Sequence, residues 1–198
     1  MRILHISDTH GKHHLLQNLL PTDVVVHSGD ISFGGSDNEV MDFIEWFGAL
    51  PYKYKIFIAG NHDDCLYGSN VEGLPDNCFY LCNSGVTIEG INFYGVPLFM
   101  ADFVTGDYDS SIHKIPTSTD VLITHQPPHG ILDFASKIHY GDVLLLQKVL
   151  EIKPTYHLFG HIHDAYGIEK NSSTLFVNAA ILNEDYAIAN QAILIEIV

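Results

Sequence analysis

The chain has 198 residues, of which 46% are hydrophobic, and a formal net charge of −15 from 24 acidic and 9 basic residues. The length suits one domain, which we expect to span residues 1–198. The acidic balance argues against broad nucleic-acid binding and against binding to an anionic membrane surface, because both need a basic footprint. A small anionic substrate is still compatible, since bound metal ions can reverse the local field.

The N-terminus and the cysteines indicate a compartment. Residues 1–5 lead straight into an apolar segment without a cleavable signal pattern, and no apolar run in the sequence reaches membrane-spanning length. Cys65, Cys78 and Cys82 leave at least one thiol unpaired, which fits a reducing compartment. A zinc site at these cysteines is the weaker interpretation, because no fourth ligand has the spacing of a structural site. We therefore expect a cytoplasmic protein without a membrane partner.

Strand-like and helix-like segments alternate along the chain. Five short apolar runs predict buried strands, at Leu4–Ser7, Val24–His27, Ile56–Ala59, Val121–Thr124 and Tyr156–Phe159. Helices are predicted over His13–Leu20, Asn38–Leu50 and Gly141–Ile152, and a proline follows each of the last two. Short strands within Cys78–Val96 suggest a meander, and strands at Thr174–Asn178 and Ala192–Val198 end the chain.

The segment Pro97–Thr119 is the least regular. We expect either a functional or mobile loop or a surface excursion with one helical turn. Two sheets packed face to face with helices outside is the simplest arrangement that buries all the predicted elements.

A polar motif follows each of the five apolar runs. The motifs are Asp8-Thr9-His10, Gly29-Asp30, Gly60-Asn61-His62, His125 and Gly160-His161-Ile162-His163. In α/β sheets the strand exits are where ligands and catalytic groups collect. Imidazole and carboxylate together are the ligand set of a hydrolytic transition-metal centre. Each motif is weak by itself, because Asp30 could cap a helix and Asn61-His62 could be only a turn.

The joint order of the motifs is far more specific. DTHG, GD, GNHD, THQPP and GHIHD run from Asp8 to His163 and resemble the calcineurin-like metallophosphoesterase superfamily. FGHIHDAYG and THQPPHGILD are similar to its small class II-type, MPPED-like phosphodiesterases. The resemblance implies an α/β fold, namely a four-layer α/β/β/α sandwich with two facing mixed β-sheets, and a dinuclear metal site. By position it implies that one ion is bound by Asp8, His10 and His163, the second by Asn61, His125 and His161, and that Asp30 bridges them.

The resemblance gives His62 a different role, which is to protonate the leaving oxygen or stabilise the charge that develops there. Many relatives carry a supporting polar residue after the Gly-Asp motif, and here only Ser32 could serve. Three other histidines, His5, His27 and His157, lie within apolar strands and are expected in the core or behind the ligands.

The chemistry is also consistent without the resemblance. Two divalent ions beside Asp8, Asp30 and a bridging hydroxide retain roughly one net positive charge, because histidine and asparagine ligands are neutral. The ion pair lowers the pKa of bridging water, so hydroxide exists near neutral pH. His62 has a suitable intrinsic pKa for proton transfer. A mixed oxygen and nitrogen ligand set without thiolates suits Mn²⁺, the first choice here, or Fe, Zn or Ni.

The leading interpretation is a metal-dependent phosphoesterase that hydrolyses phosphodiester bonds of small nucleotides or related esters. The alternatives are a phosphomonoesterase, including a protein phosphatase, and a metal-binding scaffold with vestigial activity. Only Lys12 adjoins a motif, which favours diesters, because monoester sites usually supply cationic clamps. The complete ligand set and His62 argue against the scaffold. The expected partner is a small phosphate-ester substrate, and a homodimer is compatible with the sequence.

Overall fold

The computed structural model describes residues 1–17 and 19–197. Its strands are β1 (Arg2–Ile6), β2 (Val24–His27), β3 (Tyr54–Phe57), β4 (Cys78–Tyr80), β5 (Ser84–Ile88), β6 (Ile91–Val96), β7 (Val121–Thr124), β8 (Phe134–Ala135), β9 (Ile138–His139), β10 (Tyr156–Phe159), β11 (Gly167–Lys170), β12 (Leu175–Asn178) and β13 (Ile193–Glu196). The α-helices are α1 (Asp37–Ala49), α2 (Met100–Thr105), α3 (Asp107–His113) and α4 (Val143–Ile152). Three short 3₁₀ helices are η1 (His13–Leu15), η2 (Asp64–Leu66) and η3 (His163–Ala165).

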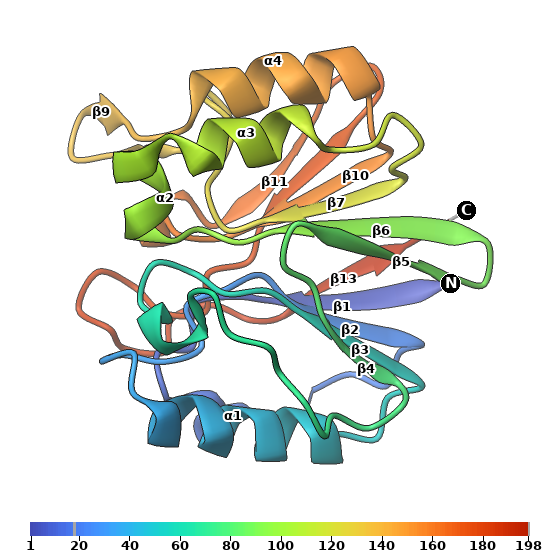
Figure 1. The fold of residues 1–198 in the computed structure, drawn as a ribbon, viewed down its shortest axis with the longest axis vertical. Coiled ribbons are helices and arrows are strands. Elements are labelled where there is room, and N and C mark those ends of the chain that lie inside the picture. The colour runs from blue at the N-terminus through green and yellow to red at the C-terminus, as the bar shows by residue number, and fades with distance from the viewer. Residues whose placement is uncertain (18, 198) are drawn as a thin grey trace.

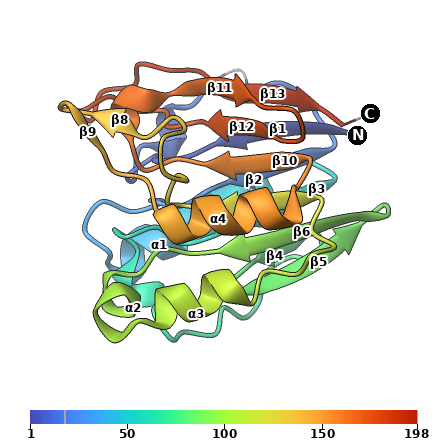
Figure 2. The same ribbon diagram turned by 90° about the horizontal axis from the view of Figure 1, so that it is seen from above.

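Two mixed sheets face each other. The first has the order β13-β1-β2-β3-β4, in which β1 to β4 run parallel and β13 is antiparallel. The second has the order β11-β12-β10-β7-β6-β5, with antiparallel strands at both edges. Helix α1 covers the outer face of the first sheet, and α3 and α4 cover that of the second (Figures 1 and 2). The predicted four-layer α/β/β/α sandwich is therefore confirmed.

Three apolar layers hold the sandwich together. Alternate residues of each central strand point to opposite faces, so Ile3 packs between the sheets while Leu4 packs toward α1. Likewise, Ile123 lies between the sheets and Leu122 lies under α3 and α4. Because both faces of these strands are buried, their sequences read as continuous apolar runs. This is why the five predicted strands were visible in the sequence.

The two longer helices form close to where the sequence predicts them. Helix α1 begins at a capping box, in which Ser36 Oγ accepts from the N–H of Glu39 and the Glu39 carboxylate accepts from the N–H of Ser36. Helix α4 begins at Asp142, whose Oδ1 accepts from the N–H of Leu145 at 2.6 Å. Among the described residues, no helix combines the length and apolar character needed to cross a bilayer.

The three short strands predicted over Cys78–Val96 form, but the first does not pair with the second as a meander requires. Strand β4 pairs in parallel with β3 in the first sheet, whereas β5 and β6 form an antiparallel hairpin at the edge of the second. The chain therefore crosses between the sheets after Tyr80, as Figure 1 shows. Short strands that follow one another in sequence suggest local pairing, but here the parallel register with β3 buries Cys78 on the α1 side.

Other elements also differ from prediction. The segment Pro97–Thr119 holds two short helices, α2 and α3, because Tyr108 and Ile112 are buried against the second sheet. The predicted helix His13–Leu20 is reduced to η1, since Leu16 is already extended; its residue 18 lies outside the described residues. The predicted last strand, Ala192–Val198, is seen as β13, with residue 198 outside the described part. The third strand lies two residues earlier than predicted, at Tyr54–Phe57.

Candidate metal centre

The polar motifs meet at one edge of the sandwich, where both sheets contribute. Strands β1, β2 and β3 lead into the loops of Asp8, Asp30 and Asn61. Strands β7 and β10 of the facing sheet lead into His125 and the His161–His163 loop. The structure brings together all seven residues that the sequence analysis named as metal ligands, and it places them between the two sheets.

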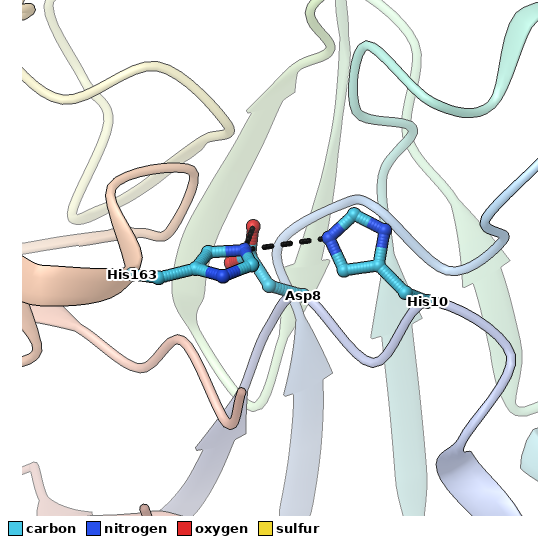
Figure 3. Close-up of side chains that lie close together, drawn as sticks. All are labelled: Asp8, His10 and His163. Carbon is cyan, nitrogen blue, oxygen red and sulfur yellow. Dashed lines mark hydrogen bonds and ion pairs between the residues drawn. The ribbon is translucent and has the colours of Figure 1, made fainter. Parts of the chain in front are cut away.

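One cluster consists of Asp8, His10 and His163 (Figure 3). The Nε2 atom of His163 lies 3.5 Å from Asp8 Oδ1 and 3.4 Å from His10 Nε2. Each imidazole Nδ1 faces a carbonyl oxygen, that of Ser32 for His10 at 3.1 Å and that of Asn183 for His163 at 2.9 Å.

Those carbonyl contacts decide what the cluster can bind. A carbonyl oxygen only accepts hydrogen bonds, so each Nδ1 carries a proton and each Nε2 is the ring nitrogen left to face Asp8. In their neutral forms the two imidazoles each present a lone pair at Nε2 beside the carboxylate, and one cation would satisfy all three groups. The residues fit a metal ion, with the histidines oriented from behind by backbone carbonyls as in known metal sites.

The second cluster consists of Asp30, His125 and His161. The Nε2 atom of His125 lies 3.3 Å from Asp30 Oδ2 and 3.1 Å from Asn61 Oδ1, while its Nδ1 faces the Ser28 carbonyl at 2.9 Å. Asp30 Oδ2 also lies 3.5 Å from Nε2 of His10 in the first cluster. Asp30 is thus the carboxylate positioned between the two clusters.

Unusual backbone geometry aims these side chains. Asp8, His10, Asp30 and His161 have φ values of 55°, 43°, 56° and 69°, which non-glycine residues seldom adopt. Such strain persists only when the surrounding structure holds it, and it gathers at functional sites. Here the strain falls in the loops that follow β1, β2 and β10, which carry the candidate ligands.

The glycines of the motifs make room for the ligands. A Cβ atom on Gly160 would stand 2.0 Å from Asp8 Oδ2, and one on Gly60 would stand 2.2 Å from Asp30 Oδ1. On Gly29 it would stand 2.6 Å from Nδ1 of His125. All three distances are far below van der Waals contact, so these positions exclude any side chain.

The electrostatics of the clusters are those of a cation site. Burial by itself raises the pKa of Asp8, but its hydrogen bond to His163 and the neighbouring imidazoles hold that pKa well below its usual range. Burial likewise lowers the pKa of His125, yet the charges of Asp30 and Asp8 raise it to about 9. The two carboxylates thus attract positive charge at this position, which a metal ion would supply in place of a proton.

His62 belongs to neither of these two clusters. Its backbone N–H donates to Asp30 Oδ1 at 2.9 Å, and its Nδ1 faces the carbonyl of Phe33 at 2.8 Å. Its ring stands edge-on to that of His10, with centroids 4.7 Å apart, close enough that His10, Asp30 and His62 could also share an ion. The backbone thus fixes His62 at the rim of the centre.

Asp63 is a functional residue that the sequence analysis missed. Its buried carboxylate accepts from the N–H groups of Gly60 at 2.8 Å, Ser32 at 2.9 Å and Ile31 at 3.2 Å, and from the Ser32 hydroxyl at 2.7 Å. It joins the loop of Asp30 to the loop of Asn61. The available signal was an acidic residue directly after His62 in a motif expected to be buried. The Ser32 hydroxyl donates to Asp63 and lies 2.9 Å from the carbonyl of His62, while the Ser32 carbonyl faces His10.

Three histidines outside the clusters are core residues, as the sequence analysis expected. His5, His27 and His157 are fully buried. Each ring Nε2 pairs with a hydroxyl, those of Ser28, Thr9 and Thr124 respectively.

An open pocket of about 530 Å³ lies over the clusters. Outside the ligands and His62, it is lined by Ala135, Ser136, Tyr140, Ile162, Asp164, Glu184 and Tyr186. No Lys or Arg is among the described residues that line it. Lys12, the basic residue nearest a motif, donates instead to the backbone carbonyl of Tyr186.

Comparison with known proteins assigns the family. A family model for calcineurin-like phosphoesterases matches residues 1–165. The chain belongs to the calcineurin-like phosphoesterase family. It is 36% identical over 232 aligned residues to human metallophosphoesterase domain-containing protein 1, across 99% of this chain and 71% of that protein. It is also 36% identical over 227 residues to a UPF0046 protein of Caenorhabditis elegans, across 100% of this chain and 81% of that protein.

Solved structures agree on the fold. A phosphopantetheinyl hydrolase from Mycobacterium tuberculosis superposes with a TM-score of 0.58 at 13% identity, across 93% of this chain and 90% of that chain. Calcineurin-like phosphoesterases generally use a dinuclear divalent metal centre, and the two Asp/His clusters of this member are the candidates for it. This calcineurin-like phosphoesterase is thus a metal-dependent hydrolase of phosphate esters.

Proposed function

We propose that this calcineurin-like phosphoesterase hydrolyses phosphodiester bonds of small nucleotides or related esters. The observation that carries the proposal is the charge of the pocket: it contains the acidic residues Asp164 and Glu184 and, among the residues described, no basic one. A diester carries one negative charge at the reacting phosphate, whereas a monoester carries nearly two and is usually held by cationic clamps. The acidic rim therefore disfavours the monoester.

The charges at the rim of the pocket come from Asp164 and Glu184 and are not offset by Lys12. The hydrogen bond with Asp164 and the charge of that residue raise the pKa of Glu184. Lys12 could have offset them, but its ammonium group is held by the Tyr186 carbonyl. A terminal, doubly charged phosphate would meet repulsion on entry, while a diester with two organic arms would place less charge there.

The residues of the site have separate roles in metal binding and proton transfer. Asp8, His10 and His163 would hold one divalent ion, Asn61, His125 and His161 the other, and Asp30 would join them. When bound, the ion pair supplies Lewis acidity and lowers the pKa of water to near neutral. His62 lines the pocket, and its Nδ1 is held by the Phe33 carbonyl while its N–H is held by Asp30. As an imidazolium it would donate its Nε2 proton to the leaving oxygen and become the neutral imidazole.

Mn²⁺ is the metal we propose, with Fe, Zn and Ni as alternatives. The clusters offer three carboxylate or amide oxygens and four imidazole nitrogens, from the residues Asp8, Asp30, Asn61, His10, His125, His161 and His163, and no thiolate among the described residues. Such a mixed set of hard and intermediate donors suits these ions better than a soft metal.

A paired assay tests the proposal. The metal-supplemented protein would be given bis(p-nitrophenyl) phosphate and p-nitrophenyl phosphate, and kcat/KM would be compared for each of the four metals. We expect the diester to be preferred. Glu184→Gln should shift the ratio toward the monoester by removing rim charge, while Glu169→Gln, at an exposed position on β11, should not.

The alternatives make different predictions for the same assay. A monoester preference in the wild-type protein, unaffected by Glu184→Gln, would point to a phosphomonoesterase. Absence of turnover on both substrates, with both ions bound, would indicate a metal-binding scaffold.

A further inference from the structure

A separate group of metal-ligating side chains lies away from the pocket, where η1 meets α1. It consists of His13 and His14 of η1 and Asp42 of α1. Nε2 of His14 is 3.1 Å from each oxygen of Asp42, and Nε2 of His13 is 3.1 Å from Asp42 Oδ2. Asp42 thus stands between the two imidazoles.

His13 is the unexplained member of this group. Its side chain is fully buried, yet neither of its ring nitrogens has a hydrogen-bond partner among the described residues. Its Nε2 points at the Asp42 carboxylate without hydrogen-bond alignment. A buried polar group without a partner costs free energy, and a cation between His13 and Asp42 would remove that cost at Nε2.

The distances and charges suit a single transition ion. Tetrahedral bonds of about 2.0–2.1 Å place neighbouring ligand atoms roughly 3.3 Å apart, close to the 3.1 Å observed. His14 and Asp42 are each 55% exposed, so the remaining coordination position faces solvent. Burial lowers the pKa of His13, and the hydrogen bond from His14 lowers the pKa of Asp42, so both are in their ligand forms at neutral pH.

We propose that His13, His14 and Asp42 form a mononuclear binding site for a divalent transition ion such as Zn²⁺, separate from the dinuclear centre. Two imidazoles and one carboxylate with open positions are a recognised ligand set for such ions. Only Gly11 and Lys12 separate His13 from His10. The ion would therefore fasten the loop of Asp8 and His10 to helix α1.

The chain carries its own reporter for this site. Trp46, the single tryptophan, has its ring centroid 4.9 Å from that of His13 and 6.5 Å from that of His14. A paramagnetic ion bound by these histidines would quench Trp46 emission at short range. Variants of the site separate this signal from that of ions bound elsewhere in the molecule.

The test is a Cu²⁺ titration of the folded full chain, followed by Trp46 fluorescence, since Cu²⁺ binds nitrogen and oxygen sites more tightly than its neighbours. The variants are His14→Ala and Asp42→Asn, both at exposed positions. The matched control is His139→Ala, which removes another exposed histidine that contacts a carboxylate, that of Asp133. We expect saturable quenching in the wild type and in His139→Ala, prevented by Zn²⁺, and at least tenfold weaker Cu²⁺ binding in the two site variants.

Elemental analysis after dialysis against Zn²⁺ gives a second readout. His14→Ala should hold one ion fewer per chain than the wild type while its circular dichroism is unchanged. Identical quenching curves for all four proteins, or equal Zn²⁺ content in His14→Ala and the wild type, would overturn the proposal.

Discussion

Both carboxylate oxygens of Asp8 accept a hydrogen bond from the backbone N–H of His161, at 3.0 Å each, although 153 residues separate the two. Asp8 follows a strand of one sheet and His161 follows a strand of the other. The first and last motifs of the chain are therefore joined directly, without any ion. The position of each ligand depends on the packing of both sheets.

Gly160 should be irreplaceable for steric reasons. In Gly160→Ala the new Cβ would lie 2.0 Å from Asp8 Oδ2 and 2.1 Å from Ser7 Oγ, so Asp8 must move. We expect loss of metal from the first cluster and at least a hundredfold loss of turnover. The matched control is Gly48→Ala in α1, where the nearest atom would be 3.5 Å away; it should keep full activity and gain about 0.5–1 kcal/mol of stability. Elemental analysis measures the metal content, kinetics measures the turnover, and urea denaturation measures the stability.

Asp30 should be the least replaceable ligand, because among the carboxylates that the structure describes it alone lies within 3.5 Å of a histidine in each cluster. We expect Asp30→Ala to lose both ions and nearly all turnover, and Asp30→Asn to be nearly as defective because a neutral amide removes the charge. Metal content by elemental analysis is the direct measurement. Two bound ions and a near-normal rate in Asp30→Ala would reduce Asp30 to a turn residue.

His62 should affect the chemistry rather than the metal content. We expect His62→Ala to keep both ions and to lose about 10²–10⁴-fold in kcat with a poor leaving group. With an activated aryl leaving group, which scarcely needs a proton, the loss should be smaller. Equal losses on both substrates would identify His62 as a positioning residue, and loss of an ion would identify it as a ligand with His10 and Asp30.

Stability should fall in mild acid because of the buried histidines. Burial lowers the pKa of His5, His27 and His157 to about 3, from 6.5. Below about pH 6.5 the unfolded chain takes up protons that the folded chain refuses, so stability is lost as pH falls from about 6.5 toward 3. Each of the three histidines lowers the free energy of unfolding by about 1.4 kcal/mol for every unit that the pH falls within this window.

The variant that tests this is His157→Gln, whose amide can still reach Thr124, the partner of the imidazole. Urea denaturation at several pH values should show a shallower loss of stability than in the wild type, by about 1 kcal/mol per pH unit. His113→Gln, at an exposed position, should follow the wild type. Parallel curves for all three proteins would mean that His157 is not protonated on unfolding in this range.

The sequence predicts the central strands and the ligand cluster for a single physical reason. Strands buried on both faces are mostly apolar, as Val24, Val25 and Val26 of β2 show, so the polar motif at each exit stands out. What it does not predict is pairing between distant strands. Nothing local in Cys78–Tyr80 tells that it joins β3 in parallel rather than the hairpin that follows it.

The sequence also does not predict which groups a side chain contacts in the folded protein. Asp63 looks like any turn carboxylate until its four hydrogen-bond donors, from Gly60, Ile31 and Ser32, are in place. Tyr108 and Ile112 look like scattered apolar residues in a polar stretch, and only burial against the second sheet makes their segment helical.

The placement of the clusters on the seam between the sheets has a consequence for the life of the protein in a cell. Ions bound there would act as a cross-link between two halves otherwise joined by apolar packing and a few hydrogen bonds. Ligands that bind only the folded state stabilise it in proportion to the logarithm of their concentration. The protein's resistance to unfolding and proteolysis would then follow metal supply, and a chelator would act on it as a denaturant does.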